Sequence, residues 1–210
     1  YSMYGLTECK RCTYLPPEQL DRRPGSVGIA IPDTEVMVLD DNGKPVPPGV
    51  AGELVVRGPH VMRGYWRDEA ATARVLRPGP NPWETVLYTG DVFTTDADGY
   101  LYFVGRKDDI IKTRGEKVAP KEVEAVLHAH PAVAEAVVIG LPDPILGQAV
   151  GAIVVRSDPE LSERDVIRHC ARHLEDFMVP KLVEFRPELP KTETGKVSRR
   201  LAAETVQAFA

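Results

Sequence analysis

The sequence predicts an α+β protein in which a β-rich, barrel-like part comes before a small mixed domain. Short apolar runs separated by Gly, Pro, Asp and Asn turns dominate residues 25–104, which is typical of many short strands. Helical and strand patterns alternate after residue 106, as in small α+β domains. The charged stretch 105–109, which begins with a glycine, is the natural junction. We therefore expect two domains, 1–105 and 106–210.

In the first part, each expected strand is bounded by turn residues. The run 35–39 ends at Asp40-Asp41-Asn42-Gly43, and the run 53–57 follows Pro47-Pro48-Gly49. The tetrapeptide Asp96-Ala97-Asp98-Gly99 between two β-prone runs is a hairpin signal. The expected strands are 35–39, 53–57, 92–95 and 100–104.

In the second part, helix-start signals are clear. Pro120 suits a first helical position, and Val123, Val126 and Leu127 recur on one helical face. Ser162 and Asp165 have the spacing of a capping box. The expected elements are helices from 120 to about 130, from 162 to about 175 and from 199 to 209, with strands 133–139 and 150–155.

Bulk properties exclude several classes of protein. The chain has 210 residues, 43% hydrophobic and 27% charged, with a formal net charge of −5, so no electrostatic argument supports binding to nucleic acid or anionic membranes. No apolar run approaches the roughly 18 residues that span a bilayer. Three cysteines do not make a disulfide framework. We expect a cytoplasmic protein with no membrane span and no nucleic-acid partner.

Four ordered motifs carry the chemistry: YGLTE at 4–8, YTGD at 88–91, GRKDDIIKTRG at 105–115 and LPKTETGK at 189–196. Glycine allows close backbone approach, a Thr hydroxyl can bond phosphate, and a Glu suits Mg²⁺. Taken alone, the first motif is more typical of an ordinary strand-to-helix turn. In order and spacing, the four motifs resemble the adenylate-forming enzymes, namely acyl-CoA synthetases, peptide-synthetase adenylation domains and luciferases. The resemblance runs from residue 1 to about 201.

The resemblance implies the ATP-dependent activation of a carboxylic acid to an acyl-adenylate with release of pyrophosphate, followed by thioester formation. The implied cofactors are ATP or AMP, Mg²⁺, and either CoA or the phosphopantetheine of an acyl or peptidyl carrier protein. Because both reactants of the first step are anions, catalysis needs cations and positioning more than acid–base groups.

Lys196 is the expected mobile cation, and Gly195 is expected to make its loop flexible. A Walker-type phosphate loop does not fit, because Pro190 stands where a glycine is needed and Val197 follows the lysine. The alternative for Lys196 is a solvated basic tail, since Arg199 and Arg200 follow.

The resemblance also implies a nucleotide site. In it, Asp91 accepts the ribose hydroxyls and Arg106 supports ribose or phosphate. Tyr4 and Gly5 lie against the nucleotide, with Tyr4 stacked on adenine. The other implied members are Thr7, at the α-phosphate, and Glu8, as the metal ligand; both count as catalytic. In isolation, Asp91 is more typical of a turn residue, and Arg106 of a surface ion-pair partner of Asp108 or Asp109.

Asp108 matches the family's hinge, about which a mobile C-terminal domain rotates between two poses. Lys112 matches a lysine that some members use in the second step. Arg114, Gly115 and Lys117 would form the thiol-acceptor loop. Many CoA-using members have two adjacent glycines where this chain has Arg114-Gly115, so the acceptor stays open between CoA and a carrier protein.

Family members are more than twice this long and carry an upstream Ser/Thr/Gly-rich phosphate loop that does not occur here. We therefore expect the C-terminal part of a ligase, or a split half that needs its N-terminal portion as a partner. The alternative is a non-catalytic module that binds nucleotide or a carrier protein, and a luciferase-like oxygenase is a third option. The sequence does not identify the acid.

Overall fold

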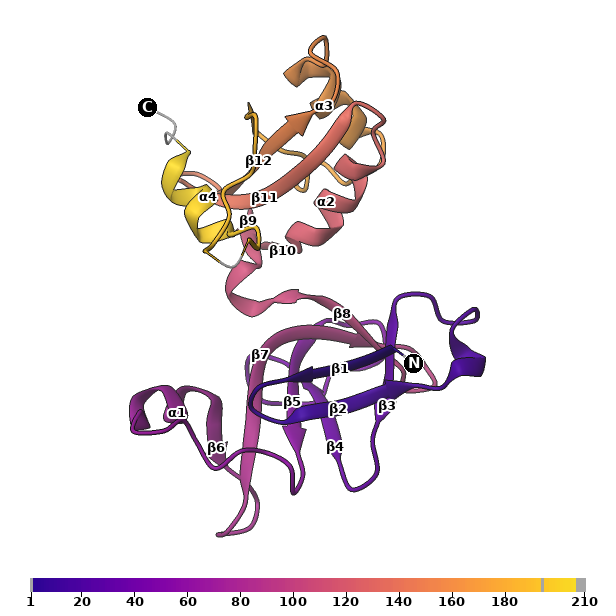
Figure 1. Ribbon diagram of the computed structural model, residues 1–210, viewed down its shortest axis with the longest axis vertical. Helices are drawn as coiled ribbons and strands as arrows, with labels where there is room; N and C mark the ends of the chain where they lie inside the picture. The colour runs from indigo at the N-terminus through magenta and orange to yellow at the C-terminus, as the bar shows by residue number, and fades with distance from the viewer. Residues whose placement is uncertain (1, 194, 207–210) are drawn as a thin grey trace. The chain divides into compact units, whose positions relative to one another are not determined.

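The computed structural model describes residues 2–193 and 195–206, and it has a mixed α+β fold built on two largely antiparallel sheets (Figure 1). The expected α+β class is confirmed. The chain divides into two compact units, Tyr1–Lys107 and Asp108–Ala210, called unit 1 and unit 2 below. In the part of the chain that the structure describes, no helix has the length and apolar character needed to cross a membrane.

Unit 1 is an eight-stranded sheet. Its strands follow the order β1-β2-β3-β8-β7-β5-β4, and β6 pairs with β7. The elements are β1 (Ser2–Leu6), β2 (Lys10–Leu15), β3 (Ser26–Ala30), β4 (Glu35–Leu39), β5 (Gly52–Arg57), α1 (Glu69–Val75), β6 (Leu76–Pro78), β7 (Thr85–Thr95) and β8 (Leu101–Arg106).

The structure both confirms and corrects the expected strands of unit 1. The strand 35–39 and the hairpin around 96–99 are confirmed, and Asp96 closes the hairpin by accepting Gly99 N–H at 3.0 Å. β7 starts at Thr85, earlier than the expected residue 92, because its first three residues pair with β6, and alternate residues from Leu87 to Phe93 are buried. The strand-to-helix alternative for the first motif is wrong: β1 turns into β2, so the motif is part of a hairpin.

Gly28 in β3 is a position where only glycine fits. Its φ is +91°, and a Cβ there would lie 1.7 Å from the carbonyl oxygen of Tyr14 on β2. Such contact forces the two paired strands apart, in addition to the strain of a left-handed backbone.

We expect Gly28→Ala to lower the free energy of unfolding of unit 1 by about 2–5 kcal/mol, measured by urea denaturation of the chain. Gly25→Ala is the matched control, because Gly25 has φ +82° and a Cβ there meets nothing within 4 Å. The control should lose only about 1 kcal/mol. Equal losses in the two variants would contradict the steric argument.

Unit 2 is a five-stranded sheet with helices. Its strands follow the order β10-β9-β12-β11, and β13 lies parallel beside β12. The elements are β9 (Ile111–Thr113), β10 (Glu116–Val118), α2 (Pro120–His128), β11 (Val133–Asp143), β12 (Gly147–Arg156), α3 (Glu163–Ala171), β13 (Leu182–Phe185) and α4 (Arg199–Thr205).

The helix-start signals of unit 2 hold in the structure. Pro120 opens α2, and Ser162 with Asp165 forms the expected capping box of α3. α3 ends earlier than residue 175, because turns bonded to Cys170 and His169 replace the helix after Ala171. α4 ends at Thr205, and residues 207–209 of the expected last helix lie outside the described residues.

Both faces of β11 are buried, which explains its continuous apolar sequence. Ala136 and Val138 pack in the core formed with α2 and α3, whereas Val137 and Ile139 pack with Ala202 of α4. Alternate residues of a strand point to opposite faces, so helices cover the sheet on both sides, as Figure 1 shows. This arrangement gives the loop before α4 a rigid support.

Candidate functional site

Three strands of unit 1 bring together Tyr4, Asp91 and Arg106. Asp91 on β7 is paired in register with Arg106 on β8, and β1 contributes Tyr4. The Asp91 carboxylate accepts a hydrogen bond from Tyr4 Oη through one oxygen and from Arg106 Nη1, at 2.8 Å, through the other. The Asp91 side chain is only 9% exposed, so its charge is desolvated and held by these two donors. These three predicted residues therefore form one cluster.

The backbone around Asp91 is fixed by hydrogen bonds that the sequence did not predict. Thr89 Oγ1 accepts the Asp91 N–H at 3.1 Å and donates to the carbonyl oxygen of Leu54 at 2.8 Å. Gly90 has φ +69°, and its N–H donates to Glu53 Oε1 at 3.1 Å. Thr89 and Glu53 thus set the direction of the Asp91 side chain.

Tyr4 is held in place and kept protonated. Its ring packs edge-to-face on Phe93, with centroids 4.9 Å apart. Burial, and next the hydrogen bond to Asp91, raise the pKa of Tyr4 above its ordinary value, because both disfavour a phenolate. Tyr4 is therefore a fixed hydrogen-bond donor to Asp91.

Gly5 has a structural reason to be glycine that involves the protein itself. A Cβ at Gly5 would lie 1.5 Å from the carbonyl oxygen of Lys10, and the pairing of β1 with β2 shifts between Tyr4 and Gly5. The close approach that the sequence suggested is thus made by strand β2. The expected contact of Gly5 with a nucleotide stays a prediction.

Glu8 lies in the turn between β1 and β2, together with exposed Thr7. Its carboxylate accepts a hydrogen bond from Tyr65 Oη, and its carbonyl oxygen accepts the N–H of Met62 at 2.8 Å. The bond to Glu8 raises the pKa of Tyr65, and the charge of Arg106 acts on the same phenol in the opposite direction. Tyr65, which no sequence motif predicted, therefore links the Glu8 turn with α1, where Thr72 Oγ1 accepts its N–H at 2.9 Å.

The side chains of unit 1 fit a magnesium ion only if water and substrate phosphates supply its other ligands. Among residues 2–193 and 195–206, no three or more His, Cys, Asp or Glu side chains are grouped so that they could hold a metal. Mg²⁺, however, commonly uses one or two carboxylates and takes its other oxygens from water and substrate phosphates. Glu8 fits that pattern as a single carboxylate.

Lys196 is exposed on a hydrogen-bonded loop of unit 2. Thr192 N–H donates to the carbonyl oxygen of Lys196 at 2.8 Å, and Lys191 pairs with Val197 in an isolated bridge. Gly195 has φ +79° and donates to the carbonyl oxygen of Thr192. Glycine here satisfies a left-handed backbone conformation. The expected flexibility of the loop stays a prediction. The loop presents the Lys196 side chain to solvent.

The β9–β10 hairpin carries the expected acceptor loop. Arg114 and Gly115 both have positive φ, +53° and +85°, which is the geometry of a two-residue type I′ turn. Lys112 and Lys117 are paired across the hairpin, and both are exposed. Two adjacent glycines would fit the same turn, so Arg114 keeps its backbone shape while adding a cation.

Asp108 is exposed in the short 3₁₀ turn Lys107–Asp109, where the two compact units meet along the chain. On its N-terminal side, Lys107 Nζ pairs with Glu53 Oε2 at 2.8 Å. On its C-terminal side, Asp109 pairs with Arg199 at 3.1 Å. Arg106, for which Asp108 or Asp109 was the alternative partner, pairs with Asp91.

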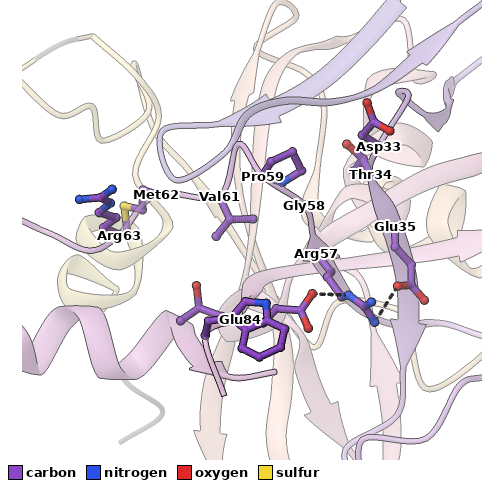
Figure 2. A pocket seen from close by; sticks show the side chains of 12 residues that line it. Asp33, Thr34, Glu35, Arg57, Gly58, Pro59, Val61, Met62, Arg63 and Glu84 are labelled. Carbon is purple, nitrogen blue, oxygen red and sulfur yellow. Dashed lines mark ion pairs between the residues drawn. The ribbon is translucent and has the colours of Figure 1, made fainter. Parts of the chain in front are cut away.

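A pocket of about 700 Å³ lies elsewhere in unit 1. Figure 2 shows Arg57 on its wall between Glu84 and Glu35, with Nε 2.6 Å from Glu84 and Nη1 3.2 Å from Glu35. None of the predicted site residues, all of which the structure describes, lines it. Met62 contributes to its wall and also bonds Glu8, so the pocket borders the Glu8 turn.

The chain matches two family models and many known proteins. Residues 1–66 match the AMP-binding enzyme family, and residues 122–196 match the AMP-binding enzyme C-terminal domain. A long-chain-fatty-acid–CoA ligase from Escherichia coli O6:H1 is 44% identical over 197 residues, covering 94% of this chain and 34% of the ligase. The ligase of the same name from Yersinia pestis is 46% identical over 197 residues, covering 94% of this chain and 34% of that ligase.

Solved structures agree with these sequence matches. The o-succinylbenzoate CoA synthetase of Bacillus subtilis, in complex with its acyl-adenylate intermediate, has a TM-score of 0.87 and 32% identity, covering 100% of this chain and 42% of that one. The same synthetase in complex with ATP and a magnesium ion has a TM-score of 0.83 and 34% identity, covering 95% of this chain and 40% of that one. The chain thus spans about a third of the length of the curated relatives it matches. By its motifs, its fold and these matches, the chain belongs to the adenylate-forming superfamily of AMP-binding enzymes and corresponds to a portion of such an enzyme.

Proposed function

We propose that this chain is the C-terminal part of an AMP-forming acid–thiol ligase. In the first step, a carboxylate oxygen of the acid attacks the α-phosphorus of ATP, and pyrophosphate leaves. In the second step, a thiol sulfur attacks the acyl carbonyl, and AMP leaves as the thioester forms. Unit 1 supplies one wall of the nucleotide site, and unit 2 supplies the lysines that act on the reacting groups.

The observation that carries this proposal is the buried Asp91 carboxylate with its two donors. An ionised carboxylate has about four acceptor positions, and Tyr4 and Arg106 use two of them. The remaining capacity matches the two hydroxyls of a ribose. Tyr4, fixed by Phe93 and Asp91, offers an aromatic surface for adenine, and Arg106 adds positive charge for ribose or phosphate.

The Glu8 turn is proposed to meet the phosphates. Thr7, exposed at the turn, is placed as a hydroxyl donor to the α-phosphate, with Gly5 at the start of the approach. Glu8, oriented by Tyr65, holds Mg²⁺ together with phosphate oxygens. The ion would neutralise charge that builds up as pyrophosphate leaves.

Unit 2 is proposed as the mobile lid of the ligase, and unit 1 as the barrel-like end of its large domain, with the domain limit near 105–106. Rotation about Asp108 brings Lys196 to the phosphates for the first step. The other pose brings the β9–β10 hairpin forward, where Lys112 assists the second step and Arg114, Gly115 and Lys117 meet the acceptor.

We propose CoA as the acceptor and a fatty acid as the first acid to test, because the curated relatives are long-chain-fatty-acid–CoA ligases. The cationic hairpin is equally suited to the phosphopantetheine arm of a carrier protein, which is the alternative. All three cysteines are buried free thiols, as is usual in a reducing compartment, so we place the enzyme in the cytoplasm.

The test is ATP–pyrophosphate exchange over a panel of fatty, aromatic, hydroxy and amino acids. We expect the 210-residue chain alone to be silent, because most of the acid pocket and the upstream phosphate loop belong to the N-terminal portion. The complete enzyme should exchange, most strongly with a fatty acid. A complete enzyme that binds AMP but exchanges with no acid would overturn the ligase proposal in favour of a non-catalytic nucleotide-binding module.

A further inference from the structure

Arg199 makes contacts that a solvated basic tail does not make. It is the first residue of α4 and lies three positions after Lys196. Its Nη2 is 2.7 Å from both carboxylate oxygens of Glu124 on α2, and its Nη1 is 3.1 Å from Asp109 Oδ2. The Arg199 side chain is 27% exposed and that of Glu124 only 14%. These ion pairs are therefore shielded from solvent far more than ordinary surface pairs.

Glu124 is itself anchored to the sheet of unit 2. Its Oε1 also accepts the N–H of Val138 at 2.9 Å, and Val138 belongs to β11, the last strand in the sheet order. α2 and α4 pack against opposite faces of this strand. Arg199 and Glu124 therefore meet around the edge of β11, which ties α4 to the rigid core.

The loop with Lys196 is closed immediately before this anchor. Ser198 N–H donates to the carbonyl oxygen of Pro190 at 2.9 Å, and Ser198 Oγ accepts the N–H of Leu201 as the cap of α4. The loop from Pro190 to Ser198 thus begins and ends at one point, next to Arg199. The position of that point depends on where the Arg199 side chain is held.

The second partner, Asp109, follows the expected hinge Asp108 directly in the chain. One guanidinium therefore joins the residue after the hinge, the helix α2 and the base of the Lys196 loop. We propose that Arg199 is a positioning residue that makes these parts move as one body, so that rotation at Asp108 delivers Lys196 to a fixed place. This inference rests on the proposed function, in which Lys196 acts on the phosphates in the first step only.

The experiment compares half-reactions in the complete enzyme with Arg199→Ala, Arg199→Lys and Asp109→Asn. Arg200→Ala is the matched control, because Arg200 is the next residue of α4, is 78% exposed and pairs within the helix with Glu204. In Arg199→Ala, we expect kcat of adenylation to fall about 100-fold with little change in KM for ATP, as misplacement by about 1 Å does. Thioester formation from supplied acyl-adenylate should change less than about twofold, since Lys196 is not used there.

The two other variants should each lose less adenylation kcat than Arg199→Ala. Asp109→Asn keeps the Glu124 pair and should give an intermediate loss, and Arg199→Lys should recover only part of kcat, because Lys cannot form the two-pronged contact. Equal losses in both half-reactions would show a merely structural role and overturn the proposal, as would an unchanged kcat of adenylation.

A second measurement does not depend on catalysis. Hydrogen exchange of residues 190–198 in the 210-residue chain should be faster in Arg199→Ala than in Arg200→Ala, because the base of the loop is released. Equal exchange in the two variants would overturn the positioning role even if adenylation falls. Conversely, a loop that loosens as expected, in an enzyme where Lys196→Ala has no effect on adenylation, would refute the proposed function and leave the attachment of the loop standing.

Discussion

Replacing Lys196 by Ala in the complete enzyme is expected to reduce adenylation by at least about 10³-fold, because a fixed cation at the developing charge supplies several kcal/mol of transition-state stabilisation. The side chain is exposed, and its backbone bonds survive the change, so the midpoint of thermal unfolding should stay within about 1 °C. The measurement is ATP–pyrophosphate exchange beside a thermal melt.

The control for this prediction lies on the same loop. Lys191 is also exposed and makes a long ion pair, 3.8 Å, with Glu135, so Lys191→Ala removes a cation of the same type without the proposed role. Its adenylation should remain within about twofold of the parent. Adenylation that persists in Lys196→Ala would assign the catalytic charge to another residue.

Replacing Asp91 by Asn is expected to raise KM for ATP and to weaken AMP binding by about 10–100-fold. The substitution keeps the shape of the side chain but removes the charge that strengthens hydrogen bonds to the ribose hydroxyls, worth about 1.5–3 kcal/mol. It also removes the ion pair that orients Arg106. Calorimetric titration with AMP measures the loss in the complete enzyme.

Asp98→Asn is the matched control, because Asp98 also pairs with an arginine of unit 1, Arg23, but is 69% exposed in a hairpin turn. Its AMP affinity should equal that of the parent. If the two variants bind AMP equally well, Asp91 is only a structural partner of Tyr4 and Arg106, and the ribose site must be sought elsewhere.

Much of the fold follows from local signals in the sequence. The turn at Asp40–Gly43, the Pro120 start of α2 and the Ser162 capping box each act through neighbouring residues, and each was predictable. The hairpin of β1 and β2 was not predicted. Its pairing depends on the close approach of Gly5 to the carbonyl oxygen of Lys10, which lies across the turn. The early start of β7 was missed because it depends on pairing with β6, which local turn signals do not reveal.

In the candidate site, too, some features were predictable from the sequence and others were not. Asp91 and Arg106 were named from motifs, but their pairing needs the register of β7 and β8, which no single motif contains. Tyr65 bonds Glu8, which is 57 positions away in the sequence, and Glu53 bonds Gly90, which is 37 positions away. Neither Tyr65 nor Glu53 carries a sequence signal of its own. Arg199 was named only in the solvated-tail alternative for Lys196, and its enclosure beside Glu124 has no signal in the sequence.

The bond from Val138 to Glu124 has a further consequence for the sheet of unit 2. A strand at the end of a sheet offers its amides to any extended chain that approaches, which is a common route to aggregation. At Val138 that amide is already taken by the Glu124 side chain of the neighbouring helix, and Arg199 pairs with the same carboxylate. The Glu124 carboxylate that pairs with Arg199 therefore also hinders this stretch of β11 from pairing with another molecule.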